Sequence, residues 1–399
     1  MRSYKPYIIK LCIVFLCFWG WILTGSAQKV ETNDYFYVLN TQQGLSDNCI
    51  LQMIQLADGR LAVRTRKGIN LYNGRRFTFI PLPAEKAESI TKYKGQTHLY
   101  ADSQDRLWIK EYQKIFCILL SEGRLQEHSL DSLPGNGKEN KMRIIPNTPT
   151  GNAIQDLFVD SRKNVWVVMG DSLLNTQDGN LIHLKKEWGY LQDLDTDGKQ
   201  VYAFMDSGIV AVFQKDKLVY AASAYSTAEA QHYRNTSLTI QTLSGQFYQI
   251  RTGRGEKNKA DASIFLHFNP ETRKFARIFA CDYILHTLNM SSDNQALISS
   301  QHGYLMFDFK LGTTPREVRE LSLPDGKSLT TGINTVYRDK EGAIWLGTYH
   351  DGLIYVSPML GLFFTIDQPW WQSGWAIAGF VVFLATLVGI ITLYLRRRK

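Results

Sequence analysis

The sequence is poor in cysteine and lacks the common catalytic motifs. Five of its 399 residues are cysteine and no two form a CxxC pair, so neither a disulfide framework nor a zinc site of the usual spacing is expected. The patterns GxSxG, HExxH and the P-loop are missing, and the eight histidines are scattered without metal-ligand spacing. We therefore expect no enzyme activity, no cofactor and no metal ion.

Excess charge is also missing from the main part of the chain. The formal net charge is +8, but residues 1–27 hold three basic residues and no acidic one, and four more basic residues end the chain. Without these seven, 38 basic residues stand against 37 acidic ones. A nucleic-acid-binding body would carry its own basic face, so no nucleic-acid partner is expected.

Residues 1–27 have the pattern of a secretory signal peptide. Basic residues up to Lys10 precede the apolar run Leu11–Leu23, and the small residues Gly25 and Ala27 suit a signal peptidase site. The apolar run is short for a membrane span, so cleavage is favoured over a retained helix. At least one of the three remaining cysteines should be a free, buried thiol; they are Cys49, Cys117 and Cys281.

The other end of the chain has the pattern of a transmembrane helix. Ser373–Leu395 are 23 residues without a charge, which is long enough to cross about 30 Å of hydrocarbon. Tryptophans stand at positions 370, 371 and 375, and Arg396–Lys399 follow the apolar run, which by the positive-inside rule face the cytoplasm. We predict a single-pass inner-membrane protein with a periplasmic body (28–368), a membrane segment (369–395) and a cytoplasmic basic tail (396–399).

Small residues within this predicted helix suggest a contact between helices. Gly374 and Ala378, and again Ala385 and Gly389, are pairs spaced by four residues, as in helix dimers that pack through small side chains. A homodimer is therefore one expected partner. With four residues in the cytoplasm, signal output would need another membrane signalling partner or a longer chain.

The body between the two ends is built from a repeated unit. Its clearest copy, residues 333–355, has an apolar strand, an Asp/Gly turn, a strand that carries Trp345, a second turn and a third strand. The positions equivalent to Trp345 are residues 62, 108, 166, 202, 248, 296 and 345, with a mean spacing of about 47 residues. Short β-branched and aromatic segments at this period predict an all-β fold, a seven-bladed β-propeller, followed by the C-terminal transmembrane helix.

Ring closure can also be predicted. The last unit has no obvious outer strand after Tyr355, whereas a spare strand, Tyr35–Asn40, precedes the first unit. Pairing of the spare strand with the seventh blade would close the ring and remove two exposed sheet edges.

Three tryptophans invite two interpretations. Trp108, Trp166 and Trp345 are aromatic residues of the kind that stack on sugars, but they recur at the same place on the second strand. We therefore expect them to pack between neighbouring blades.

The repeats resemble those of two-component regulator propellers. The residues that carry this resemblance are Gly44–Asn48, Asp339–Gly342, Trp345–Thr348 and Gly352–Tyr355, together with the tryptophan-rich segment Pro369–Trp375 before the predicted helix. The family forms the periplasmic sensor region of hybrid two-component systems in Bacteroidetes, so the resemblance implies sensing of a glycan or another extracytoplasmic ligand. The family pattern of two propellers, an immunoglobulin-like domain and a kinase is not present, so the chain is either a stand-alone receptor or the sensor part of a longer protein.

A binding site is expected on the propeller face where loops lead into strand one and join strands two and three. The sequence places Asp47, Lys67, Asp206 and Arg254 on this face. The candidate ligand contacts are Asn48, Arg64, Arg66, Arg251, His302, Tyr349, His350 and Asp351. Their mixed charge suits an anionic or neutral oligosaccharide; the alternative is that they are solvated turn residues.

These observations predict a membrane-anchored periplasmic receptor module that senses a ligand, most simply an oligosaccharide, without a kinase of its own. The alternative is a membrane-tethered propeller scaffold that holds another periplasmic protein. An enzyme of polysaccharide processing is a third, less favoured class, because no catalytic motif supports it.

Overall fold

The structure is a computed structural model that describes residues 36–90, 97–126, 130, 154–226, 229, 237–252, 262–292, 294–318, 321–322, 328–329, 332–356 and 396. All of these except Arg396 belong to one compact unit. The predicted signal peptide (1–27) and membrane segment (369–395) lie outside the described residues. Within the described part of the chain, no helix has both the length and the apolar composition needed to cross a membrane.

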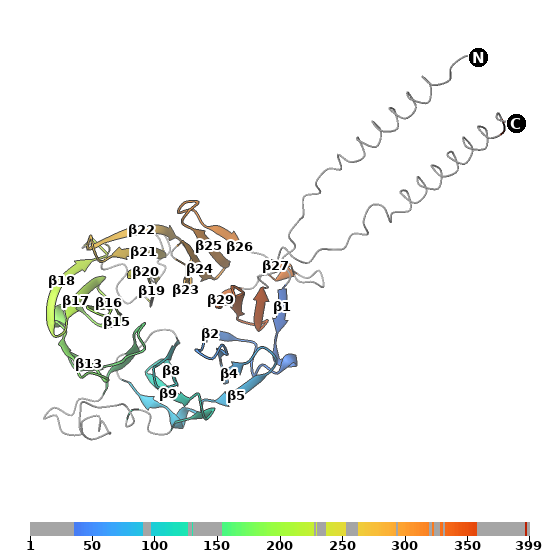
Figure 1. The fold of residues 1–399 in the computed structure, drawn as a ribbon, viewed down its shortest axis with the longest axis horizontal. Helices are drawn as coiled ribbons and strands as arrows, with labels where there is room; N and C mark the ends of the chain where they lie inside the picture. The colour runs from blue at the N-terminus through green and yellow to red at the C-terminus, as the bar shows by residue number, and fades with distance from the viewer. Residues whose placement is uncertain are drawn as a thin grey trace, which may run out of the picture. The chain divides into compact units, whose positions relative to one another are not determined.

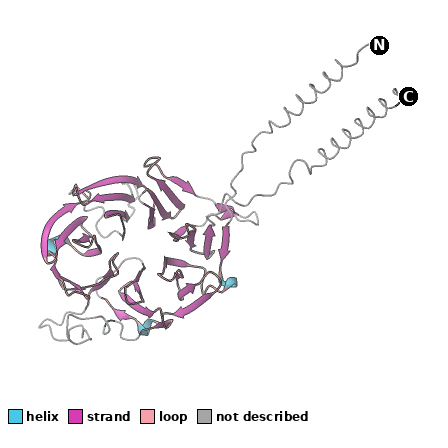
Figure 2. Ribbon diagram, viewed as in Figure 1, coloured by secondary structure: helices cyan, strands magenta, loops and turns pink. Residues whose placement is uncertain are grey.

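The described strands form seven antiparallel sheets of four main strands each, arranged in a ring (Figure 1). Strand dominates the ribbon, with only short helical turns between blades (Figure 2); these turns are η1 (Thr41–Gln43), η2 (Ala84–Lys86) and η4 (Lys186–Trp188). The predicted all-β, seven-bladed propeller is therefore confirmed.

Six blades contribute their strands in chain order, from the inner first strand to the outer fourth strand, whereas in the seventh blade the N-terminal strand supplies the fourth position. The first strands are β2 (Ile50–Gln55), β7 (His98–Ala101), β11 (Asp156–Val159), β15 (Leu191–Thr196), β19 (Ser237–Leu243), β23 (Leu285–Ser292) and β29 (Ile333–Arg338). The second strands are β3 (Leu61–Thr65), β8 (Arg106–Glu111), β12 (Val165–Met169), β16 (Val201–Met205), β20 (Gln246–Thr252), β24 (Gln295–Ser300) and β30 (Ile344–Thr348).

The outer half of each blade follows the same order. The third strands are β4 (Gly68–Tyr72), β9 (Lys114–Leu119), β13 (Ser172–Asn175), β17 (Ile209–Gln214), β21 (Ser263–Asn269), β25 (Gly303–Asp308) and β31 (Leu353–Val356). The fourth strands are β5 (Phe77–Pro81), β10 (Arg124–Leu125), β14 (Leu181–His183), β18 (Lys217–Ser223), β22 (Lys274–Cys281), β26 (Arg316–Val318) and β1 (Phe36–Leu39). Two short additions are β6 (Glu88–Ser89), which pairs with β9, and the hairpin of β27 (Leu321–Ser322) and β28 (Ser328–Leu329).

The ring closes as the sequence predicts. Strand β1 pairs antiparallel with β31, with Phe36 opposite Val356 and Leu39 opposite Leu353. Gly352 makes this close approach feasible: its φ is +88°, and a Cβ at this position would lie 2.5 Å from the carbonyl oxygen of Leu39. A residue other than glycine would therefore be strained there and would also clash with the closing strand.

The seven positions equivalent to Trp345 all lie on second strands, which confirms the repeat assignment. Trp108 packs with Leu157 of the third blade, Trp166 packs with Leu194 of the fourth, and Trp345 packs in the cluster that holds Ile50 of the first. The three indoles are 0%, 2% and 8% exposed, respectively. They fill the seams between blades, as predicted.

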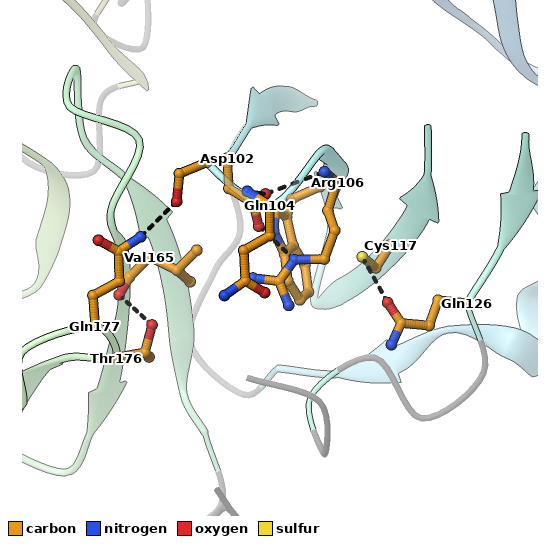
Figure 3. A network of polar contacts seen from close by, with 10 residues as sticks. Asp102, Gln104, Arg106, Cys117, Gln126, Val165, Thr176 and Gln177 are labelled. Atoms are coloured by element: carbon orange, nitrogen blue, oxygen red, sulfur yellow. Dashed lines mark hydrogen bonds and ion pairs between the residues drawn. The ribbon is translucent and has the colours of Figure 1, made fainter. Parts of the chain in front are cut away.

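An aspartate anchors each of these tryptophans. Oδ2 of Asp102, Asp160 and Asp339 accepts a hydrogen bond from Nε1 of the tryptophan six residues later, at 2.7, 2.9 and 2.8 Å. In the second blade Arg106 also pairs with Asp102, with its Nε 2.6 Å from Oδ2 (Figure 3). Oδ1 of each aspartate meanwhile accepts the backbone N–H four residues on, so one carboxylate fixes both the turn and the indole.

The three described cysteines are buried thiols. Cys117 packs between the second and third blades, where burial raises the pKa of its thiol to about 12. The prediction of a buried thiol is confirmed, and at this pKa Cys117 stays protonated and unreactive at neutral pH.

Candidate functional site

The two faces of the propeller differ in the loops that form them. We call the face where first strands begin and second and third strands are joined the top face, and the opposite one the bottom face. The topology places the described candidate residues on the top face, at strand ends or in turns. Arg254 lies outside the described residues.

Some of the candidates meet where the seventh and first blades join. The backbone N–H of Gly352 donates to the carbonyl oxygen of Asn48 at 3.0 Å. The Arg66 side chain lies against the buried Cys49 thiol, and Cys49 in turn lies near the Tyr349 hydroxyl. Burial raises the pKa of both Cys49 and Tyr349.

The sixth blade joins this neighbourhood through a residue that the sequence analysis missed. The ring of His286 lies edge-on to that of Tyr349, with centroids 6.3 Å apart. His350 and Asp351 complete the turn, with the Asp351 N–H donating to Thr348 Oγ1 at 2.8 Å. His302 instead packs against Tyr283 at 5.4 Å, in the turn between β24 and β25.

The two candidate arginines at strand ends are buried rather than solvated. Arg64 is 5% exposed, and its Nη2 lies 2.6 Å from Glu111 Oε2 of the second blade. Arg251 is fully buried; its Nε donates to Gln249 at 2.8 Å and its Nη1 to the Met205 carbonyl oxygen of the fourth blade at 3.2 Å. Both side chains bond to neighbouring blades. A ligand would therefore contact them only through guanidinium N–H groups that these bonds leave unused.

A buried charged network that sequence reasoning missed begins at Lys110, the residue before Glu111 on β8. Nζ of Lys110 lies 3.0 Å from Oδ1 of Asp156, donates to the carbonyl oxygen of Leu157 at 2.9 Å, and sits 3.7 Å from the centre of the Phe158 ring. Lys110 is 0% exposed. This network links the second blade to the third at the top face.

Burial dominates the protonation equilibria of this network. It lowers the pKa of Lys110 and raises that of Asp156, although each partner opposes the shift of the other. Burial raises the pKa of Asp193 in the fourth blade to about 7, although the Lys110 charge lowers it. Burial lowers the pKa of His98 to about 3, with the Lys110 charge adding to the effect, so this imidazole is neutral at physiological pH.

The top-face half of the blades also holds buried polar atoms that lack a hydrogen-bond partner among the described residues. Five different blades supply them: Gln52 Oε1, Gln155 Oε1, Arg251 Nη2, His286 Nε2 and Asp351 Oδ2. Buried polar groups are nearly always paired, because leaving one unpaired costs about 1–3 kcal/mol. Their set contains acceptors, a guanidinium donor and an imidazole nitrogen, which is a chemistry suited to a polyhydroxylated ligand.

A sequence signal for this set exists but is weak. Gln52 lies within the first strand of its blade, His286 is the second residue of its first strand, and Gln155 directly precedes another. A polar residue at the start of an inner strand interrupts the expected apolar pattern. It therefore indicates that this end of the strand does more than pack in the apolar core. Which of these residues would be buried could not be read from the sequence.

The comparisons with known proteins agree with this architecture. The family model described as a two component regulator propeller matches residues 328–350, which span β28 of the short hairpin and β29 and β30 of the seventh blade. This part of the seventh blade is thus similar to the repeat of two-component regulator propellers. The resemblance stated from the repeats is thereby confirmed. No curated protein matches the chain.

Solved structures show the same fold. The extracellular domain of the hybrid two component system BT3049 from B. thetaiotaomicron is 16% identical, with a TM-score of 0.54 over 81% of this chain and 42% of that one. The corresponding domain of BT4673 from the same organism is 13% identical, with a TM-score of 0.53 over 81% of this chain and 40% of that one. The chain thus spans about two fifths of those extracellular domains.

An enzyme shares the fold as well. Virginiamycin B lyase from Staphylococcus aureus is 10% identical, with a TM-score of 0.51 over 81% of this chain and 98% of that one. At such identities the likeness shows the propeller alone, so the fold does not decide between sensor and enzyme.

Proposed function

We propose that this propeller is the ligand-sensing module of a two-component-type signalling system and that it holds an oligosaccharide at its top face. The proposal includes the membrane anchor and the periplasmic location that the two ends of the sequence predict. The module binds its ligand without turning it over, and output passes to a kinase in a partner or in further residues of the chain.

One observation carries the site. Five blades each bring a buried, unpartnered polar atom to the top-face half of the ring, and the Asn48, Arg66 and Tyr349 neighbourhood lies on the same face. A ligand that bonds to several blades at once would be bound best in one arrangement of those blades. Binding would therefore favour that arrangement, which is the physical requirement for a sensor.

Titration calorimetry on the full chain in a sugar-free detergent tests this proposal. A panel of neutral and acidic oligosaccharides serves as the probe, and the substitutions are Gln52→Met, Gln155→Met and His286→Phe. Each keeps the shape of the side chain and removes an atom without a described partner, so the fold should keep its stability. We expect each to weaken binding of the recognised glycan by about tenfold, the value of one lost hydrogen bond to a ligand.

The control is Gln214→Met, at an exposed position on the bottom-face end of β17, which should leave binding unchanged. Hydrolysis or other turnover of any glycan would contradict the non-enzyme part of the proposal. Binding of a periplasmic protein by a propeller that ignores the whole glycan panel would favour the scaffold alternative. An immunoblot of the native membranes for the propeller would show whether its chain continues into a kinase.

A further inference from the structure

A cavity lies on the bottom face, at the seam where the ring closes. Its volume is about 510 Å³, within the range of small-molecule sites. The seventh blade supplies Tyr37, Leu39, Asp339, Glu341, Trp345 and Tyr355, and the first blade supplies Gln55, Gly59, Leu61, Tyr72, Asn73 and Gly74. Strands β1 and β31 meet β2 and β4 here, on the side of the ring where the label β29 stands in Figure 1.

The cavity borders one of the three Asp–Trp units described above. Trp108 and Trp166 occupy the equivalent place in the second and third blades and are 0% and 2% exposed, whereas Trp345 is 8% exposed and borders the cavity. Trp166 of the third blade packs in one cluster with Trp188 and Phe213, which lie in or next to the fourth blade. The seam of the seventh blade has the same Asp–Trp unit but leaves room beside the indole.

Aromatic rings form the apolar part of the wall. The centroid of Trp345 is 4.7 Å from that of Tyr355 and 5.8 Å from that of Tyr72, and Tyr355 lies 6.5 Å from Tyr37. Tyr37 is 62% exposed, so its ring presents a surface at the rim. Flat apolar surfaces of this kind pack well against the C–H face of a pyranose ring.

Among the described residues that line the cavity, the polar ones are carboxylates, amides and tyrosines, and none is lysine or arginine. Gln55 Nε2 lies 3.2 Å from Glu341 Oε2, and the Lys340 N–H donates to Gln55 Oε1 at 2.9 Å, which holds the two blades together at the cavity. Asp339 Oδ2 already accepts a hydrogen bond from Trp345 Nε1. Two carboxylates without a lysine or arginine in the lining repel an anion, while carboxylate, amide and tyrosine hydroxyl groups accept and donate to neutral hydroxyls.

From this combination we infer that the cavity is a binding site for a neutral pyranose unit, which packs on Tyr37 and Tyr355 and bonds to Glu341 and the amides. The site is distinct from the top-face site proposed above, since it lies on the opposite face and excludes acidic sugars. Its occupant contacts both the closing strand β1 and the first blade, so it would stabilise the closed ring.

Saturation-transfer NMR on the full chain in a sugar-free detergent tests the inference. The probes are neutral disaccharides, the matching uronic acids and the matching amino sugars. We expect transfer to at least one neutral disaccharide, and any transfer to its uronic acid should come from the top face and stay unchanged in Tyr37→Ala. Tyr37→Ala should weaken binding of the neutral disaccharide by about tenfold, because it removes one stacking surface. Phe79→Ala is the matched control, since Phe79 is an exposed ring on β5 that does not line the cavity.

The further outcomes distinguish the two sites. If Gln52→Met or His286→Phe abolishes the neutral signal while Tyr37→Ala leaves it intact, the bottom-face inference is overturned and the top-face proposal stands. Transfer confined to the amino sugars would also overturn it, because the cavity would then select a cation. Loss of the neutral signal in Tyr37→Ala, with the top-face variants unchanged, supports it whatever the top face binds.

Discussion

Lys110 of the second blade and Asp156 of the third form an ion pair with Nζ and Oδ1 3.0 Å apart and with side chains that are 0% and 7% exposed. A buried pair of this kind contributes little net stability compared with an apolar pair, but removal of one partner leaves an unpaired buried charge. The contact is therefore better understood as a device that fixes how two blades meet beneath the top face than as a source of stability.

Replacement of Lys110 alone tests this interpretation. Lys110→Met leaves Asp156 and Asp193 without their cation, so we expect a loss of about 3–5 kcal/mol in the free energy of unfolding, measured by urea denaturation. The double variant Lys110→Met/Asp156→Leu should recover part of that loss, because no buried charge of the pair remains. Lys217→Met, at an exposed position on β18, should stay within about 0.5 kcal/mol of the parent.

A double variant as unstable as Lys110→Met would show that the cost comes from the lost contact of the Lys110 ammonium with the Phe158 ring. Equal stability of the single variant and the parent would show that the pair does not hold the blades.

Asp193 gives the protein a pH-dependent stability. Its pKa is raised to about 7 by burial, opposed by Lys110 and reinforced by the carboxylates of Asp195 and Asp156. An unfolded aspartate ionises near pH 4, so between pH 4 and 7 the folded state holds the proton that the unfolded state has lost. The contribution of Asp193 to the free energy of unfolding therefore falls as the pH rises through this window and is constant above it.

The variant Asp193→Asn removes this dependence. As the pH rises from 4 to 8, the free energy of unfolding of this variant should increase by about 2–4 kcal/mol relative to that of the parent. Urea denaturation across the pH range measures the difference. The amide oxygen of the variant can still accept the Leu194 N–H that Oδ1 now accepts at 2.9 Å. Asp216→Asn, at an exposed turn, should run parallel to the parent, and an Asp193→Asn curve that also runs parallel would refute the assignment.

The Asp–Trp unit predicts a different kind of loss. Asp160 accepts hydrogen bonds from the Asn164 N–H, the Asn164 side-chain amide and Trp166 Nε1, each at 2.9 Å. Asp160→Ala leaves the buried indole donor unpaired, so we expect it to cost about 2–3 kcal/mol of unfolding free energy. Asp178 offers the comparison, since it is exposed and caps one turn through the Asn180 N–H at 2.9 Å; Asp178→Ala should cost below 1 kcal/mol.

Much of the fold could be predicted because it depends on local pattern. The strand–turn–strand units around Trp108, Trp166 and Trp345 repeat the same turn chemistry, and a shared period places each indole on a second strand. Closure was predictable for a related reason: Phe36–Leu39 was a strand without a local partner, and the last blade was one strand short.

The site was less predictable because burial depends on which blades meet. The sequence predicts Arg64 and Arg251 to be ligand contacts on the top face, but each is the penultimate residue of a strand and its side chain bonds to a neighbouring blade. Lys110 and Asp156 are 46 residues apart, and nothing in either local sequence marks the other as its partner. The unpartnered atoms of Gln52 and His286 are likewise a property of the assembled ring.

Closure of the ring predicts the last experiment. Phe36 of β1 is 4% exposed, while the next residue, Tyr37, points outward and is 62% exposed. Phe36→Ala should cost about 3–5 kcal/mol of unfolding free energy, because it leaves a cavity under the strand that closes the propeller, whereas Tyr37→Ala should change stability by about 0.5 kcal/mol at most. Urea denaturation of both variants measures the difference. If β1 were a dispensable strand, both substitutions would be neutral; if the ring depends on it, hydrogen exchange in Phe36→Ala should quicken first in β31, whose outer edge β1 covers.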